Sequence, residues 1–277
     1  MTSILNGELI NSDAPSSLQI NRSFLYGDGF FETMRFVNQK IVFEEEHWRR
    51  IRKSIELLGL NIETIPDRQK LLEEIKLLVE ANKINSSARI RLTIFRNADG
   101  FYIPQNNQSG YFLSCFPLVD KRDNYSEGIR VGIYQEQKKM AGKISHLKST
   151  SAQLYVMAGI YARENNFDEV LILNQNDNCI ESVSCNLFLV KDKIVYTPPL
   201  SEGCVDGVFR KNILRAASEI GIQVHESIIT QMDLTDAEEL FLSNVIRGIQ
   251  TIKKMNESTY ANSITKKISD YFKDFYR

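Results

Sequence analysis

One lysine in this sequence stands where it could act as a nucleophile. Lys148 lies in the segment SHLKSTSAQLY, where a polar loop meets an expected helix. A desolvated lysine amine loses its proton readily and forms a Schiff base with an aldehyde. Because Lys138, Lys139 and Lys143 stand nearby, composition does not single out Lys148, and the simpler interpretation is a solvated helix start.

A single carboxylate precedes a segment that is typical of a buried strand. Glu181 lies in NCIESVSCNLFLV (178–190), followed by the small residues 182–185 and then by the apolar run LFLV. Two interpretations are open. Either this acid belongs to an ordinary surface loop, or it faces a positive group inside the protein.

Two segments have features of anion sites. In SEGCVDGVFRKNIL, Gly207 precedes an expected helix, so the N–H groups of Val208 and Phe209 point outward from its first turn. In LSNVIRG, the turn at Ser243 and Asn244 offers a second set of amides. The alternatives are a helix start that binds only water and a plain exit from a strand.

An arginine completes a set with a recognisable chemical use. Arg50 lies in HWRRIRKS beside the apolar residues Trp48 and Ile51, and it could reach a cleft as a phosphate-binding fork. Arg49 and Arg52 are explained as a solvated helix face. An aldehyde-trapping amine, an acid for a ring nitrogen and a phosphate site are together what pyridoxal phosphate needs.

The elements that must position these residues fall into two halves. In the first half, periodicity predicts strands at 3–10, 30–37, 41–43, 88–95 and 110–118, with helices at 44–60 and 67–83. We expect a mixed sheet with the two helices against it. In the second half, strands are expected at 129–135, 168–174, 186–190, 194–198, 222–227 and 238–244, and helices at 152–165, 207–221 and 264–277.

This pattern predicts an α/β (α+β) protein of two domains. The smaller N-terminal α/β domain spans 1–118, the polar segment 119–128 is the linker, and the larger domain, at 129–277, contains a barrel-like sheet. A cleft between two such domains is a frequent place for ligand chemistry.

Composition excludes several other classes of protein. The formal net charge of −1 argues against nucleic-acid or membrane-surface binding, and no apolar run has the length of a membrane span. The N-terminus lacks the pattern of a signal peptide. Four cysteines without C-x-x-C spacing and three scattered histidines predict neither a metal site nor a disulfide framework, so we expect a cytoplasmic protein.

Several motifs in this order resemble the class IV (fold type IV) pyridoxal-phosphate enzymes. That family includes branched-chain aminotransferases, D-amino-acid aminotransferases and aminodeoxychorismate lyases. The motifs that carry the resemblance cover nearly the whole chain: YGDGFFETMR (26–35), HWRRIRKSIELLG (47–59), HLKSTSAQLYVMA (146–158), DEVLILNQNDNCIESVSCNLFLVKDKIVYTPPL (168–200), GCVDGVFR (203–210) and FLSNVIRGIQTI (241–252).

The resemblance implies a role for each candidate residue. Lys148 would form the Schiff base with the cofactor and then move the substrate proton, and Glu181 would pair with the pyridine nitrogen. The phosphate would be held by Arg50, the amides of Val208 and Phe209, and the Ser243–Asn244 region. The substrate pocket would include Tyr26, Phe31 and Arg91. The resemblance also implies a homodimer that acts on a small amino substrate.

The subgroup is less well defined than the family. Branched-chain aminotransferases have tyrosines where this chain has Gln153 and Arg89. The segments IESVSCNLF, VYTPPL and VDGVFR resemble aminodeoxychorismate lyases, although the loop NADGFYIP (97–104) lacks the arginine of their glycine-rich loop.

The sequence therefore favours a 4-amino-4-deoxychorismate lyase, which eliminates pyruvate and gives 4-aminobenzoate for folate biosynthesis. The first alternative is a branched-chain or D-amino-acid aminotransferase that uses 2-oxoglutarate. The others are a non-catalytic homologue that still binds the cofactor and an unrelated two-domain protein with accidental motifs.

Overall fold

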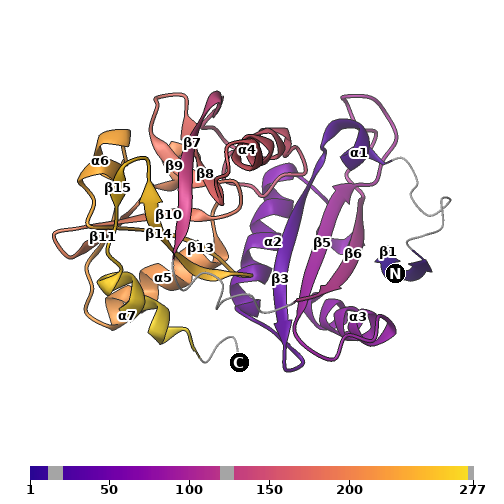
Figure 1. Ribbon diagram of the computed structural model, residues 1–277. Helices are drawn as coiled ribbons and strands as arrows, with labels where there is room; N and C mark the ends of the chain where they lie inside the picture. The colour runs from indigo at the N-terminus through magenta and orange to yellow at the C-terminus, as the bar shows by residue number, and fades with distance from the viewer. Residues whose placement is uncertain (12–20, 119–127, 274–277) are drawn as a thin grey trace. The chain divides into compact units, whose positions relative to one another are not determined.

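The computed structural model describes residues 1–11, 21–118 and 128–273, and they pack as two compact units (Figure 1). The first unit contains the described residues up to 118 together with Lys148–Ala152, and the second contains 128–147 and 153–273. The predicted linker lies outside the described residues except for Gly128. Within the described chain, no helix is both long enough and apolar enough to span a membrane.

The first unit is built on a six-stranded sheet in the order β2-β1-β6-β5-β3-β4. Its strands are β1 (Thr2–Leu5), β2 (Glu8–Asn11), β3 (Gly29–Val37), β4 (Lys40–Ile41), β5 (Ala88–Arg96) and β6 (Ser109–Pro117). Every described pairing is antiparallel, so the predicted mixed sheet is wrong. The reason is the connection from β3 to β5, whose two long helices return the chain to the end of the sheet at which β3 finishes.

Helices cover one face of this sheet. They are α2 (Glu44–Leu58), the 3-10 turn Ile62–Thr64 and α3 (Arg68–Ala81), while the short α1 (Arg22–Tyr26) lies near the end of β5. Ile51 of α2 and Ile75 of α3 pack in one core with Met34 and Leu92 of the strands. Because side chains alternate along a strand, the opposite face of β3 and β5 carries the neighbouring residues Phe31, Thr33, Arg35, Arg89, Arg91 and Thr93.

The second unit contains a nine-stranded mixed sheet, part of which closes on itself. Its strands are β7 (Ile129–Lys139), β8 (Glu169–Asn174), β9 (Cys179–Ser182), β10 (Asn186–Lys191), β11 (Ile194–Thr197), β12 (Val224–Glu226), β13 (Glu239–Asn244), β14 (Gly248–Met255) and β15 (Ser258–Thr259). The order β10-β13-β14-β7-β8-β9 returns to β10 through the pair Asn186 and Glu181. This closed ring of six strands confirms the predicted barrel-like sheet.

The remaining elements of the second unit are helical. They are α4 (Gln153–Glu164), the 3-10 turn Leu200–Glu202, α5 (Val208–Glu219), α6 (Gln231–Asp236) and α7 (Ser263–Tyr271). One core lies among β8, β10, β13 and β14, and it includes Leu187 and Leu242. A second core packs Ala158 and Ala162 of α4 against Val170 and Ile172 of β8. Both cores are therefore built on strands of the closed ring.

Candidate active site

The lysine segment is hydrogen-bonded to the start of β3. The Phe31 amide donates to the Lys148 carbonyl at 2.8 Å, and the Thr150 amide donates to the Gly29 carbonyl at 3.1 Å. The Thr150 hydroxyl donates to the Gly27 carbonyl at 2.9 Å. These bonds place Lys148 beside the YGDGFFETMR motif (26–35), which lies far earlier in the chain.

Two glycines of that motif permit this close contact. Gly27 ends α1 with φ = 65°, and a Cβ there would lie 3.0 Å from the Cβ of Ser151. Gly29 has ordinary backbone angles, but a Cβ there would lie 2.6 Å from the Ile94 carbonyl oxygen. Glycine is therefore needed at Gly27 for its left-handed backbone and at Gly29 for the approach of β5.

The side chain of Lys148 shares an aromatic neighbour with Arg91. Its Nζ lies 4.8 Å from the centre of the Phe31 ring, and Arg91 Cζ lies 3.8 Å from the same centre. Both are cation–π distances. Burial, together with the neighbouring charge of Arg89, lowers the pKa of Arg91 from its usual value. Phe31 is thus a shared neighbour of an amine and a guanidinium, and it lies with Arg91 on the face of the sheet opposite α2 and α3.

Tyr26, a predicted substrate residue, is the last residue of α1. Its ring lies 5.4 Å from that of Tyr102 and 4.9 Å from Arg22 Cζ. Arg22 also donates to Asp28 at 2.8 Å and to the Gly100 carbonyl at 2.8 Å. Arg22 therefore fixes both Tyr26 and the loop that follows β5.

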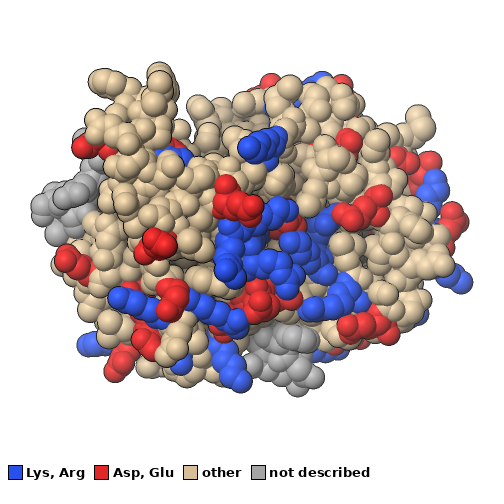
Figure 2. Space-filling model, turned by 180° about the vertical axis from the view of Figure 1, so that it is seen from behind, with Lys and Arg blue, Asp and Glu red and all other residues tan. Residues whose placement is uncertain are grey.

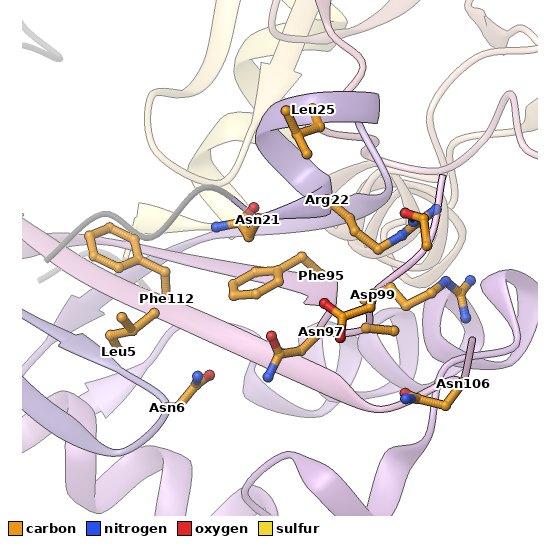
Figure 3. Close-up of a pocket in the computed structure, with 13 residues that line it drawn as sticks. Leu5, Asn6, Asn21, Arg22, Leu25, Phe95, Asn97, Asp99, Asn106 and Phe112 are labelled. Atoms are coloured by element: carbon orange, nitrogen blue, oxygen red, sulfur yellow. Dashed lines mark hydrogen bonds between the residues drawn. The ribbon is translucent and has the colours of Figure 1, made fainter. Parts of the chain in front are cut away.

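A cavity of about 470 Å³ opens beside this loop (Figure 3). Arg22, Asn21 and Leu25 approach it from α1, while Phe95, Asn97 and Asp99 come from the end of β5 and the loop beyond it. The predicted site residues do not line it. Because Arg22 and Arg96 share the Asp28 carboxylate, at 2.8 and 3.1 Å, the arginines of this cavity are already held by the protein.

Arg50 is fixed by a buried carboxylate. Its Nε donates to Glu32 Oε1 at 2.6 Å, its Nη2 donates to Oε2 at 2.7 Å, and His47 Nδ1 lies 2.8 Å from Oε2. Burial opposes ionisation, but the charge and hydrogen bonds of Arg50, with those of His47, lower the pKa of Glu32 to about 2. Glu32 is therefore an anion at neutral pH and sets the orientation of Arg50.

Glu181 is buried and accepts hydrogen bonds from three elements. Lys139 Nζ and the Tyr155 hydroxyl each donate to Oε1 at 2.7 Å, and the Val205 amide donates to Oε2 at 2.7 Å. Burial, and then the Glu181 charge, raise the pKa of Tyr155 well above its usual value, so this hydroxyl stays protonated. Of the two interpretations of Glu181 from the sequence, the structure supports the one with a positive group inside.

The start of α5 and Ser243 form one polar region. α5 begins at Val208. Its N-cap residue is Gly207, which has no side chain that could cap the first turn of the helix. A Cβ on Gly207 would lie 1.8 Å from Asn186 Oδ1, and Asn186 is paired with Ser243 across β10 and β13. Side chains of such a pair share one face. The buried Ser243 hydroxyl has no hydrogen-bond partner among the described residues, so this region suits an oxyanion.

Two amides of the turn after Asn244 are already hydrogen-bonded, so this turn is not the open set of amides that the sequence predicted. Asn244 Oδ1 accepts from the amides of Ile246 at 3.0 Å and Arg247 at 2.7 Å. Asn244 Nδ2 reaches the Ser184 carbonyl at 3.3 Å. Asn244 therefore fills this turn with its own side chain and ties it to the loop between β9 and β10.

The predicted residues are divided between the two units. The first unit contains Tyr26, Phe31, Arg50, Arg91 and Lys148, and the second contains Glu181, Val208, Phe209, Ser243 and Asn244. In the first unit, Lys148, Phe31 and Arg91 are neighbours. In the second unit, Gly207, the residue before Val208, lies next to Asn186, and Asn186 is paired with Ser243. The partners of these residues were not assigned from the sequence: they are Glu32, His47, Lys139, Tyr155 and the Val205 amide.

The two units together define a mixed α/β fold, one unit with an antiparallel sheet and the other with a closed ring of strands. Residues 29–255 match the family described as amino-transferase class IV, and the chain belongs to this family. The enzymes of this family depend on pyridoxal phosphate, so the protein is a pyridoxal-phosphate-dependent enzyme.

Known proteins resemble the chain over nearly its whole length. A Rickettsia bellii protein named "Probable branched-chain-amino-acid aminotransferase" is 26% identical over 98% of this chain and 93% of its own. The branched-chain aminotransferase of Thermoproteus uzoniensis has the same fold with a TM-score of 0.88, at 23% identity, 99% coverage of this chain and 94% of its own. The 4-amino-4-deoxychorismate lyase of Pseudomonas aeruginosa has a TM-score of 0.86, at 23% identity and 98% coverage of both chains.

Proposed function

We propose that the protein is a 4-amino-4-deoxychorismate lyase, which releases pyruvate and leaves 4-aminobenzoate. The main support for this proposal is that two cationic groups lie near Phe31: Arg91 Cζ is 3.8 Å and Lys148 Nζ is 4.8 Å from the centre of its ring. This substrate has two carboxylates, one on its ring and one on its ether side chain. A guanidinium beside the reactive amine suits a second carboxylate, whereas an aliphatic side chain would be better placed against apolar walls.

The residues of this chain fit the cofactor. The buried Ser243 hydroxyl without a described partner and the uncapped start of α5 suit the phosphate, together with the amides of Val208 and Phe209. Arg50, oriented by Glu32, would contribute charge to the phosphate, and Asn244 would shape the adjoining turn. Glu181 has acceptor capacity left for a ring N–H.

Lys148 would carry out the proton transfers of the reaction. When bound, pyridoxal phosphate supplies the electron sink that makes the substrate C–H next to the amine acidic. The Lys148 amine would take this proton. The adjacent C–O bond then breaks, the ring becomes aromatic, and the departing enolate of pyruvate takes up a proton. Tyr26 and Arg91 would orient the substrate, with Phe31 as the surface on which Arg91 is held.

The distribution of charge supports an anionic substrate. Although the formal net charge is −1, Arg35, Arg89 and Arg91 lie together on one face of β3 and β5, and Figure 2 shows Lys and Arg side chains, with acidic side chains among them, on one side of the protein. A local concentration of cations raises the concentration of anionic ligands nearby and their rate of association.

The direct test is to supply the pure enzyme with 4-amino-4-deoxychorismate. We expect stoichiometric release of pyruvate and 4-aminobenzoate, measured by a coupled lactate dehydrogenase assay and by fluorescence. Branched-chain and D-amino acids with 2-oxoglutarate should be turned over at least about a hundredfold more slowly. This ratio corresponds to a difference of about 3 kcal/mol in activation free energy. Faster transamination than pyruvate release would contradict the proposal.

The alternative is a class IV aminotransferase, which the named Rickettsia bellii relative favours. Both reactions begin with loss of the same substrate proton. An aminotransferase would transfer the amino group of its substrate to 2-oxoglutarate and release the substrate as the corresponding keto acid. The same parallel assay separates the two activities, because glutamate forms from 2-oxoglutarate only in the second.

We also propose that the enzyme is a cytoplasmic homodimer, which rests on the family resemblance. Multi-angle light scattering of the pure protein tests the assembly, since a monomer of 31.8 kDa and a dimer of twice this mass are well separated. A monomer with full activity would overturn the proposed assembly and leave the proposed reaction in place.

Arg91→Met should weaken substrate binding more than it slows the chemistry. Loss of one charge-assisted contact costs about 1.5–3 kcal/mol, which corresponds to a rise in KM for aminodeoxychorismate of about tenfold or more. The matched control is Arg89→Met, because Arg89 lies two residues earlier on the same face of β5 and is exposed. Steady-state kinetics should show the effect for Arg91 alone, and an equal change in both variants would refute the assignment.

A further inference from the structure

The hydrogen bonds to Glu181 leave it with one open acceptor position. An ionised carboxylate has about four lone-pair positions, two on each oxygen. Lys139 and Tyr155 use both positions on Oε1, and the Val205 amide uses one on Oε2. Among the described residues, one position on Oε2 is therefore left for a further N–H donor.

The three donors come from separate elements, so the carboxylate cannot rotate without breaking several bonds. Lys139 is the last residue of β7, Tyr155 lies in the first turns of α4, and Val205 precedes α5. The Lys139 side chain is 11% exposed, and its Nζ lies 5.4 Å from the centre of the Tyr155 ring. A buried ammonium requires a partner, and here that partner is Glu181.

We infer that Lys139 is a positioning residue for the cofactor. It orients Glu181 toward the ring N–H and lowers the proton affinity of the ring nitrogen. The inference rests on the proposed role of Glu181 beside the cofactor ring. A carboxylate alone favours the protonated ring nitrogen, whereas a cation on the same carboxylate opposes it. Lys139 thus limits an effect that Glu181 would otherwise exert in full, while Tyr155 orients the carboxylate without adding charge.

The other titratable groups around this cluster do not duplicate the Lys139 charge. Burial, followed by Glu181, raises the pKa of Cys204 to about 12, so this thiol is neutral at physiological pH. Arg210 is ion-paired with Glu226, and Asp206 is paired with Lys211 at 2.8 Å. Within the described chain, Lys139 is the cation that directly contacts Glu181.

The test is the protonation of the ring nitrogen in the holoenzyme. Pyridoxal phosphate labelled with 15N in the ring is bound to the wild-type enzyme and to Lys139→Met, and the 15N chemical shift is followed from pH 5 to pH 9. We expect the ring nitrogen of Lys139→Met to keep its proton to a higher pH, by about one unit or more. The same midpoint in both proteins would overturn the inference.

Three further variants separate charge from structure. Lys139→Arg keeps a cation and should titrate close to wild type, and Lys139→Gln is the second neutral variant if Lys139→Met does not fold. Tyr155→Phe removes a neutral donor and should shift the midpoint less than Lys139→Met does. In a Glu181→Gln background, Lys139→Met should no longer raise the midpoint, because the carboxylate through which it acts is gone.

The outcomes distinguish this inference from the proposed function. If the wild-type protein takes up no pyridoxal phosphate at Lys148, the proposed function fails before Lys139 is considered. If it binds the cofactor and releases pyruvate while Lys139→Met titrates as wild type, the inference about Lys139 alone is wrong. A persistent midpoint shift in the Glu181→Gln background would also overturn it, because Lys139 would then act without Glu181.

Discussion

Lys148→Ala is expected to lower kcat by about a thousandfold or more, because it removes the amine that would attach the cofactor and move the substrate proton. Among the lysines of this segment, Lys148 is the one that contacts Phe31 at the start of β3. Its carbonyl accepts from the Phe31 amide at 2.8 Å, and its Nζ lies 4.8 Å from the Phe31 ring. No other proposed group in the chain supplies an amine for the substrate C–H.

The matched control is Lys143→Ala, because Lys143 is an exposed lysine of the same loop. It should keep wild-type turnover. Borohydride reduction of the wild-type holoenzyme, followed by peptide mass spectrometry, should place the cofactor on the peptide that contains Lys148. In Lys148→Ala this labelled peptide should be absent. Label on another lysine, or substantial turnover in Lys148→Ala, would remove Lys148 from the mechanism.

The long elements of the fold were predictable because their side-chain periodicity is strong. The helices α2 and α3 and the strands β5 and β6 lie close to the predicted ranges, since one apolar face of each meets a single core. The strands β9 and β14 were missed. Cys179–Ser182 has only four residues, and Gly248–Met255 carries lysines and a glutamine among its apolar residues, so neither has a clear pattern.

The direction of the strands in the first unit could not be derived from periodicity. Alternation reports which face of a strand is buried and says nothing about whether its neighbour is parallel. The prediction of a mixed sheet failed for this reason. The barrel-like sheet of the second unit was predicted, but the pairing that closes it, between Asn186 of β10 and Glu181 of β9, is not visible in the local sequence.

The candidate residues were predictable from ordered motifs, but their partners were not. Glu181 and Lys139 are 42 residues apart, and their contact depends on how β7 and β9 pack on the ring. Similarly, Glu32 reaches Arg50 because one residue faces inward from β3 and the other from α2. The local sequence reports neither contact, since a hydrogen bond between distant elements is a property of the tertiary fold.

Three segments of the first unit meet at the Phe31 ring. YGDGFFETMR supplies the ring and the two glycines, HLKSTSAQLY supplies the amine, and β5 supplies Arg91. A change in any of these segments would displace the amine relative to the guanidinium. Substitution of Gly29 is therefore unlike substitution at a surface turn, because a Cβ there meets the Ile94 carbonyl oxygen at 2.6 Å.

Glu32→Gln is expected to destabilise the protein by about 3–5 kcal/mol, as is typical when one partner of a buried ion pair is removed. The Arg50 guanidinium would remain buried beside a neutral amide, whose single oxygen can replace only one of the two carboxylate oxygens that now accept at 2.6 and 2.7 Å. His47 Nδ1 would lose its carboxylate partner, which lies 2.8 Å away, as well. The control is Glu56→Gln, because Glu56 is an exposed acid of the same helix as Arg50 and should change the free energy of unfolding by less than about 0.5 kcal/mol.

The pH dependence of stability identifies the carboxylate directly. Glu32 has a pKa of about 2 in the folded protein and an ordinary value of 4.5. Because its pKa is lowered by folding, Glu32 stabilises the protein in full above pH 4.5, and this contribution, about 3 kcal/mol, is lost as the pH falls toward 2. Urea unfolding at pH 7 and pH 3 should therefore show a smaller difference between wild type and Glu32→Gln at the lower pH. If the two proteins differ equally at both pH values, the charge of Glu32 is not what holds Arg50.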